Sequence, residues 1–103
     1  MDEFRLDLQA KFEEILENRN VYFQPPASLL MRYPAIRYSL KDIRTKSANN
    51  SSAYIMSPGY ECILIMKEPD TEYLARIFQI PNCKFNRYYA AEKLHHYVFT
   101  IYQ

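Results

Sequence analysis

The amino-acid sequence predicts an α+β fold, with a mostly antiparallel four- to five-stranded sheet and two helices packed on one face. Three observations favour this fold. Segments of helical or alternating periodicity follow the order helix, strand, strand, helix, strand, strand, which is typical of α+β proteins. Hydrophobic residues make up 49% of the chain, enough for a packed core. The chain has 103 residues, too few for two cores, so we expect one domain over residues 1–103.

The first predicted element is an amphipathic helix over residues 2–17. Asp2 is suited to cap this helix, and Glu3 suits the positive end of the helix dipole. Apolar side chains recur at helical spacing and form one stripe that we expect to face the core: Phe4, Leu8, Phe12, Ile15 and Leu16.

Extended segments follow this helix. Val21–Phe23 reads as a short extended piece that Pro25 and Pro26 end. Apolar and polar side chains alternate over residues 33–43, which predicts a strand with one buried face and one wet face. Residues 44–52, RTKSANNSS, are polar and have no periodicity. They predict a long loop, which is either functional or a solvated connector.

The middle of the chain predicts a central strand. Residues 54–56 and 60–67 read as two strand segments that Ser57-Pro58-Gly59 separates. The second segment, YECILIMK, is a nearly continuous apolar run, so we expect it in the centre of the sheet.

The last part of the chain predicts a helix and two aromatic-rich strands. Asp70 is expected to cap a helix over residues 70–79. The strands are predicted at residues 84–89 and 94–102, and the second of them is expected to pair in its own sheet or with a neighbouring subunit. Tyrosine is frequent in these strands and is enriched where proteins meet, which favours an assembly protein over an enzyme.

No catalytic, cofactor-binding or metal site is predicted. The chain has one glycine, Gly59, which excludes a glycine-rich phosphate loop. His95 and His96 are adjacent on a predicted strand and therefore point to opposite faces, so they cannot chelate one metal ion together. Cys62 and Cys83 have no visible base beside them and are expected to be reduced, buried thiols in a cytoplasmic setting.

Charge argues against a protein that wraps DNA or RNA, though not against a local basic patch, and hydropathy argues against a membrane span. Thirteen basic and twelve acidic residues leave a formal charge of +1, whereas dedicated nucleic-acid binders are usually strongly basic. No apolar run approaches the roughly 18 residues of a membrane span, so no membrane association is expected.

Four stretches, taken in order, carry a resemblance to a known family. They are YPAIRYS at residues 33–39, Glu68-Pro69-Asp70 after an apolar strand, IPNCKFNRYY at residues 80–89 and LHHYVFTIY at residues 94–102. Together they resemble small proteins of the head–tail junction of long-tailed bacteriophages, the tail terminator or tail completion family. The resemblance spans residues 33–103 and rests on structural rather than catalytic motifs.

The resemblance implies a non-enzymatic virion protein that assembles in the cytoplasm of a bacterial host. Its partners would be copies of itself in a ring, usually of six, together with the tail tube protein and a head connector or stopper protein. The contact residues that we expect are polar or amphipathic groups on strands, of the kinds that often anchor interfaces: Arg37, Arg87, Tyr89, His95 and Tyr97. If the loop over residues 44–52 faces a channel that DNA crosses, Arg44 and Lys46 would make transient phosphate contacts there.

Two alternatives remain open at this point. Within the same class, the protein would be a head-completion or connector-stopper protein. From another class, it would be a ribosome-dependent ribonuclease toxin, with Arg87, Tyr89 and His95 imitating the site. Such a toxin needs a strongly basic face to hold RNA phosphates, which a charge of +1 disfavours.

Overall fold

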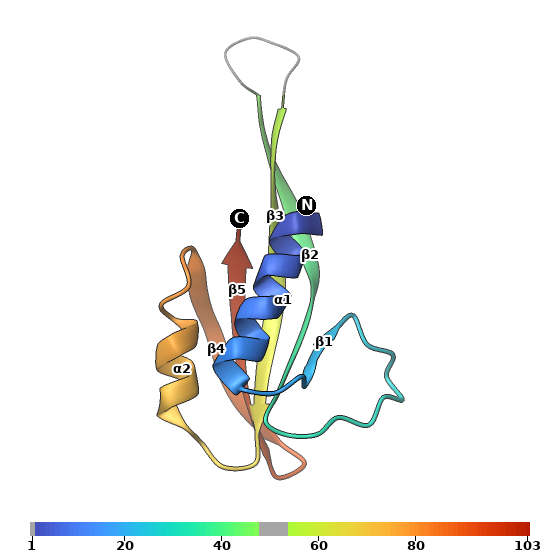
Figure 1. Cartoon of the computed structure of the whole chain (residues 1–103), viewed down its shortest axis with the longest axis vertical. Coiled ribbons are helices and arrows are strands. Elements are labelled where there is room, and N and C mark those ends of the chain that lie inside the picture. Colours follow the sequence, from blue (N-terminus) through green and yellow to red (C-terminus); the bar gives the residue numbers. More distant parts are fainter. Residues whose placement is uncertain (1, 48–53) are drawn as a thin grey trace.

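The structure of the chain is a computed structural model that describes residues 2–47 and 54–103. The element order in these residues is α1 (Asp2–Leu16), β1 (Val21–Phe23), β2 (Ala35–Ser47), β3 (Tyr54–Met66), α2 (Thr71–Ile77), β4 (Cys83–Ala91) and β5 (Leu94–Tyr102). The described strands form one sheet in the order β1-β2-β3-β5-β4 (Figure 1). The β1–β2 pair is parallel and the other three pairs are antiparallel. The predicted α+β class, with a mostly antiparallel sheet and two helices, is confirmed.

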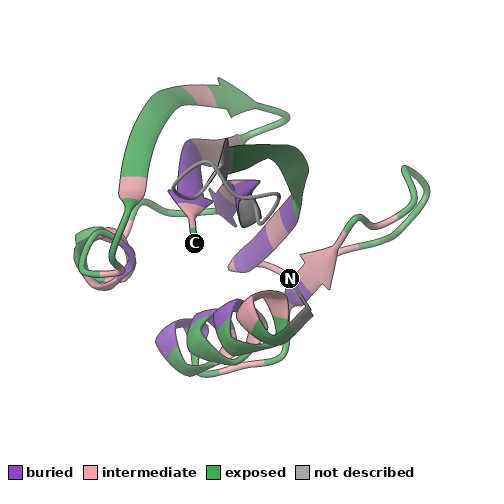
Figure 2. Cartoon of the chain, turned by 90° about the horizontal axis from the view of Figure 1, so that it is seen from above, coloured by how far each residue is buried: buried purple, intermediate pink, exposed green. Residues whose placement is uncertain are grey.

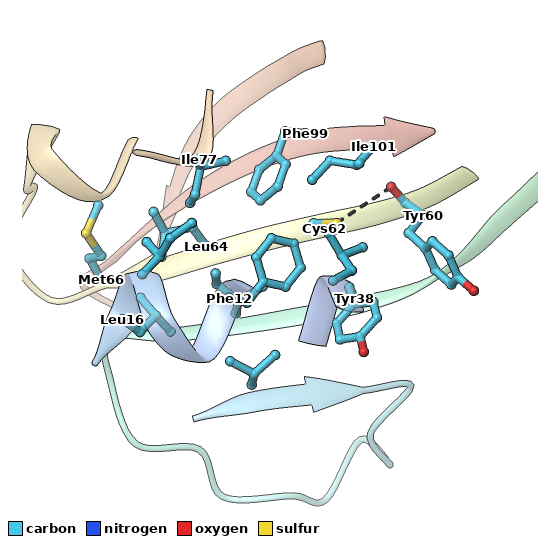
Figure 3. Close-up of a cluster of buried hydrophobic side chains, with 14 residues drawn as sticks. Phe12, Leu16, Tyr38, Tyr60, Cys62, Leu64, Met66, Ile77, Phe99 and Ile101 are labelled. Carbon is cyan, nitrogen blue, oxygen red and sulfur yellow. Dashed lines mark hydrogen bonds between the residues drawn. The ribbon is translucent and has the colours of Figure 1, made fainter. Parts of the chain in front are cut away.

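Both helices pack on the same face of the sheet. The stripe of α1 is buried as its spacing predicts, with Leu8, Phe12, Ile15 and Leu16 at 4% exposure or less. Ile77 of α2 belongs to the same buried cluster as Phe12. Figure 3 shows Phe12, Leu16 and Ile77 meeting over β3 and β5.

The second helix is shorter than residues 70–79 but begins as predicted. The Asp70 carboxylate accepts a hydrogen bond of 2.9 Å from the backbone N–H of Glu72, which satisfies one free donor of the first turn. At the other end, the N–H groups of Gln79 and Ile80 donate to carbonyls three residues back. The backbone therefore tightens into a turn ahead of Pro81, where an α-helix cannot continue.

The middle strand of the sheet is β3, as its apolar run predicts. Tyr60, Cys62, Leu64 and Met66 point toward the helices and join the core cluster (Figure 3). Ile65 alternates with them and is 3% exposed on the other side of the sheet.

The predicted loop over residues 44–52 is wrong for its first four residues. β2 continues to Ser47, and residues 44–47 pair with residues 57–54 of β3. The cross-strand ladder satisfies the backbone of this polar segment, which is why it is extended despite its composition. Residues 48–52 of the expected loop lie outside the described part of the chain.

The predicted break at Ser57-Pro58-Gly59 is also wrong, because β3 is one continuous strand. The Pro58 carbonyl accepts a hydrogen bond of 3.1 Å from the N–H of Gln103, on the side of β3 that faces β5. The N–H that proline lacks would point the same way, beyond the end of β5. The strand therefore tolerates proline without losing a ladder bond to β2.

β2 and β3 extend past the rest of the sheet as a two-stranded arm, residues 42–47 and 54–58. β5 ends opposite Gly59, and β1 pairs with β2 only as far as Tyr38. Figure 1 shows the arm rising beyond the end of β5, and it gives the described chain its length of 52 Å against 28 and 23 Å. β5 itself lies between β3 and β4, so the strand at the end of the chain pairs within its own sheet.

Candidate functional site

The sheet has a second face that neither helix covers, which we call the helix-free face. It receives the side chains that alternate with the core residues. Its innermost part is nonetheless buried: Ala35, Ile65, Val98 and Thr100 are all 3% exposed or less. Figure 2 shows β4 as an exposed arc that curls around β5, so the sheet is strongly curved. This face therefore has a small buried floor and a polar rim.

At the base of the arm, the ring of Tyr102 lies directly against Gly59, its cross-strand partner. A Cβ atom on Gly59 would lie 2.3 Å from Cε1 of Tyr102 and 2.7 Å from Oδ1 of Asp42. The guanidinium carbon of Arg44 lies 3.6 Å from the centre of the ring, and the Tyr102 hydroxyl donates to Oδ2 of Asp42 at 3.3 Å. The φ angle of Gly59 is not positive, so backbone conformation does not require glycine here. What favours glycine is the close approach of the Tyr102 ring.

Beside this stack lies a cleft of about 470 Å³, which we call the basic cleft. Three cations line it: Lys41 and Arg44 from β2, and Lys84 from β4. Its remaining lining is Asn82, Cys83, Asn86, Thr100 and Tyr102. The Asn86 amide donates to Oγ1 of Thr100 at 2.7 Å, which ties the cleft wall to its floor.

The three cations of the basic cleft have no carboxylate partner within 4.0 Å among the described residues. The ion pairs within the described residues both involve Arg76, which contacts Glu17 and Glu72 away from the cleft. The charges of the cleft are therefore available to a ligand.

Arg87, Tyr89 and His96 form a second group on the helix-free face. The rings of Tyr89 and His96 stack with centroids 4.5 Å apart and an interplanar angle of 8°. The guanidinium carbon of Arg87 lies 5.7 Å from the Tyr89 ring. Within the described part of the chain, Nδ1 of His96 is the buried side-chain nitrogen or oxygen that lacks a hydrogen-bond partner. Arg37 points to this face from β2 and, with Glu61, lines a small hollow of about 140 Å³.

The other two predicted contact residues, His95 and Tyr97, lie on the face that carries the helices. Nδ1 of His95 is 2.7 Å from the hydroxyl of Tyr88, and the rings of Tyr88 and Tyr97 are 5.0 Å apart. Burial, and to a lesser degree Tyr88, raises the pKa of Tyr97. The five predicted contact residues thus divide between two faces and do not form one patch.

The predicted DNA-contacting residues Arg44 and Lys46 belong to β2 rather than to a loop. Arg44 lines the basic cleft. Lys46 pairs with Ile55 in the arm, and its side chain lies outside what the structure describes. The other two cations of the cleft, Lys41 and Lys84, are not among the residues predicted from the sequence.

Two strips of exposed apolar side chains lie on the helix-bearing side, one along β2 and β3 at the arm and the other at the β4 edge. The arm strip is Leu40, Ile43 and Met56, which are 37–50% exposed. The edge strip is Phe78, Phe85 and Tyr88, which are 45–47% exposed. Phe78 and Phe85 are in edge-to-face contact, with ring centres 6.0 Å apart.

The cysteines have the character of structural thiols. Cys62 is buried at the centre of the core, and burial raises its pKa well above 9.0. Burial also raises the pKa of Cys83 to about 11. Both therefore stay protonated near neutral pH, where a thiol is a poor nucleophile.

In the part of the chain that the structure describes, no group of three or more His, Cys, Asp or Glu side chains is placed to hold a metal ion. Neither described helix has the length and apolar character needed to cross a membrane. Scans against protein-family models and against curated proteins found no match to this chain.

Proposed function

We propose that the protein is a tail terminator-like virion protein of a long-tailed bacteriophage, which acts by contact and not by catalysis. It assembles as a ring on the end of the tail tube and joins the tube to the head connector. The four stretches that resemble tail terminator and tail completion proteins support this class. The observation that carries the ring is the projecting arm with its apolar strip, set against a second apolar strip at the β4 edge.

A ring closes through heterologous contacts, in which two different patches of each subunit meet. The arm strip and the edge strip are two such patches, and they occupy different parts of the helix-bearing side, the β2–β3 arm and the β4 edge. A bulge between Phe85 and Arg87 interrupts the ladder of β4, which makes this edge a poor template for adding a strand. The contact that we propose therefore forms by side-chain packing of the arm of one subunit on the β4 edge of the next.

The size of the strips sets the strength of this contact. Burying a large apolar side chain contributes about 1.5–3 kcal/mol, and these residues are already about half buried. Both strips together would then contribute about 4–8 kcal/mol. Association costs about 4–15 kcal/mol in lost freedom, so a single contact is marginal. Subunits are therefore expected to remain monomeric until a tube end holds several of them together.

The test is to add purified protein to polymerising tail-tube subunits and to measure tube length by electron microscopy. Wild-type protein should shorten the tubes or stabilise their ends. Met56→Ser on the arm strip and Phe85→Ser on the edge strip should each weaken this effect, because each removes an apolar contact between neighbours.

Leu30→Ser is the matched control, since Leu30 is 93% exposed and lies outside both strips. It should cap tubes as well as the wild type does. The proposal fails if wild-type protein leaves tube length unchanged, or if Leu30→Ser impairs capping as much as the two strip variants. Binding to a head connector ring without any effect on tubes would favour the connector-stopper alternative.

One observation favours the ribonuclease alternative as a second candidate. Arg87, Tyr89 and His96 lie together on a face with several cations, and stacked aromatic rings beside basic groups suit RNA. His95, which the sequence analysis named for this role, lies on the other face. Cleavage of translating mRNA by the wild type, abolished in Arg87→Ala, would establish this candidate in place of the first.

A further inference from the structure

We propose that the basic cleft binds the backbone phosphates of double-stranded DNA without regard to sequence. This inference rests on the proposed function, because a ring between tail tube and head connector is crossed by the genome. It goes further in assigning the DNA contact to three defined side chains on the helix-free face: Lys41, Arg44 and Lys84.

The distribution of charge over the fold is the first argument. The whole chain has a formal charge of only +1. Yet α1 carries five carboxylates and two cations, whereas β2 and β4 together carry six cations and one carboxylate. Helical layer and sheet are therefore oppositely charged, and near-neutrality of the chain does not argue against a local anion site. Fields of this kind attract a polyanion to one face only.

The geometry of Arg44 is the second argument. Its guanidinium carbon lies over the Tyr102 ring, 3.6 Å from the ring centre, which restricts the side chain, and no carboxylate of the described residues lies within 4.0 Å of its nitrogens. Tyr102 is itself held from below by Gly59 and at its hydroxyl by Asp42. A guanidinium that is already oriented loses less freedom when it makes a two-pronged contact with a phosphate. Asp42 offsets one charge near the cleft, so its surroundings remain net positive.

The donors around the cations are the third argument. Lys84 and Asn86 lie on β4, across the curved sheet from Lys41 and Arg44, so the cleft presents cations from two sides. Thr100, at 2% exposure, gives it a fixed floor. The lining offers ammonium, guanidinium and amide groups, which contact phosphate oxygens. Such contacts carry no sequence information, which suits a duplex that moves through a ring.

The affinity of one subunit should be low, since non-specific DNA binding depends on how many phosphates are neutralised. Three cations give a slope of log K against log salt of about −2.7, because each neutralised phosphate contributes about −0.9. A ring would multiply weak contacts along one duplex. Binding to an isolated subunit should therefore be measured at low salt.

The experiment measures fluorescence anisotropy of two labelled duplexes of unrelated sequence between about 50 and 200 mM salt. Wild-type protein should bind both alike, and the Kd should rise about 40-fold over this range, as the slope of −2.7 requires. The double variant Lys41→Gln and Lys84→Gln should show only about a 4-fold rise, since one cation remains. The double variant Lys11→Gln and Lys67→Gln removes the same charge from exposed residues elsewhere and should behave as the wild type.

Three results would overturn the inference. The first is an equal loss of duplex affinity in both double variants. The second is that orthophosphate competes as strongly as the same concentration of duplex phosphate. The third is tighter binding of single-stranded RNA than of either duplex. The assay is independent of tube capping. If the wild-type protein caps tail tubes but does not bind DNA, the DNA-binding inference is wrong and the proposed function stands. If it binds DNA but does not cap tubes, the proposed ring function is wrong and the cleft remains a DNA site.

Discussion

The contact between Gly59 and Tyr102 makes the sharpest prediction for stability. In an extended strand, Gly→Ala ordinarily stabilises a protein by about 0.4–1 kcal/mol, because it restricts the unfolded chain. Gly59 has no positive φ angle, so its backbone would accept alanine. The added Cβ would, however, lie 2.3 Å from Cε1 of Tyr102. We expect this clash to reverse the usual sign.

The magnitude follows from what the ring must give up. Forcing an extra methyl group into a packed contact costs about 1–3 kcal/mol. Part of that cost is the Arg44–Tyr102 stack, since cation–π contacts are worth about 0.5–1 kcal/mol at exposed sites. Gly59→Ala should therefore lower the free energy of unfolding by about 1–3 kcal/mol. For a domain of this size, each kcal/mol lowers the melting temperature by about 4–8 °C.

A double-mutant cycle isolates the contact. In a Tyr102→Ala background the ring is gone, and Gly59→Ala should stabilise the chain by about 0.4–1 kcal/mol. The coupling free energy between the two positions should then be about 1.5–4 kcal/mol. In a Tyr102→Phe background the ring stays and only the hydroxyl bond to Asp42 is lost, so Gly59→Ala should remain destabilising.

Urea unfolding followed by far-ultraviolet circular dichroism is the suitable assay, because the chain has no tryptophan. If Gly59→Ala stabilises the wild-type chain as much as it stabilises Tyr102→Ala, the ring does not rest on Gly59. The oriented guanidinium of the basic cleft would then lose its support as well.

Four further predictions concern the stability of the fold and its two thiols. Ile65→Ala should lower the free energy of unfolding by about 2–5 kcal/mol in urea melts, because Ile65 is 3% exposed in the middle strand; a loss below about 1 kcal/mol would show that this side of β3 is not packed. Asp70→Ala should cost about 0.5–2 kcal/mol in the same assay, because it removes the cap of α2, whereas Asp70→Asn should retain most of the stability. Alkylation by iodoacetamide should be slow below pH 9 and should accelerate toward pH 11 at Cys83, whose pKa burial raises to about 11. Burial raises the pKa of both thiols in the folded state, so the unfolded chain loses their protons first as the pH rises. The free energy of unfolding should therefore decline above pH 9 and not below it. Early alkylation of Cys62 in the native protein would contradict its burial.

Sequence periodicity was sufficient to predict the elements that bury mainly one face. The stripe of α1, the cap at Asp70 and the apolar run of β3 each produced a correct element, because each pattern is local. The lengths of β2 and β3 could not be predicted from local patterns. Residues 44–47 have a loop-like composition, and only their pairing with residues 54–57 makes them a strand. Such cross-strand pairing overrides weak local preference.

The candidate site was only partly predictable, since a contact residue can be recognised by type but not by face. Arg37, Arg87 and Tyr89 lie on the helix-free face, whereas His95 and Tyr97 lie on the other. Strict alternation along each strand separates neighbours correctly, as for His95 and His96. It fails to group residues from different strands, because the register between strands is not visible in the sequence.

Two β-bulges explain why the basic cleft could not be predicted from the alternation of residues along each strand. The register shifts between Leu40 and Asp42 in β2 and between Phe85 and Arg87 in β4. Each extra residue inverts the alternation beyond it. Arg37 and Arg44 would lie on opposite faces of a regular strand, and so would Lys84 and Arg87, yet each pair shares the helix-free face because of a bulge. The bulges thereby gather the cations of two strands on the face that the acidic α1 does not cover. They convert a chain of nearly zero charge into a subunit with one basic side, which is the property that the DNA-binding inference requires.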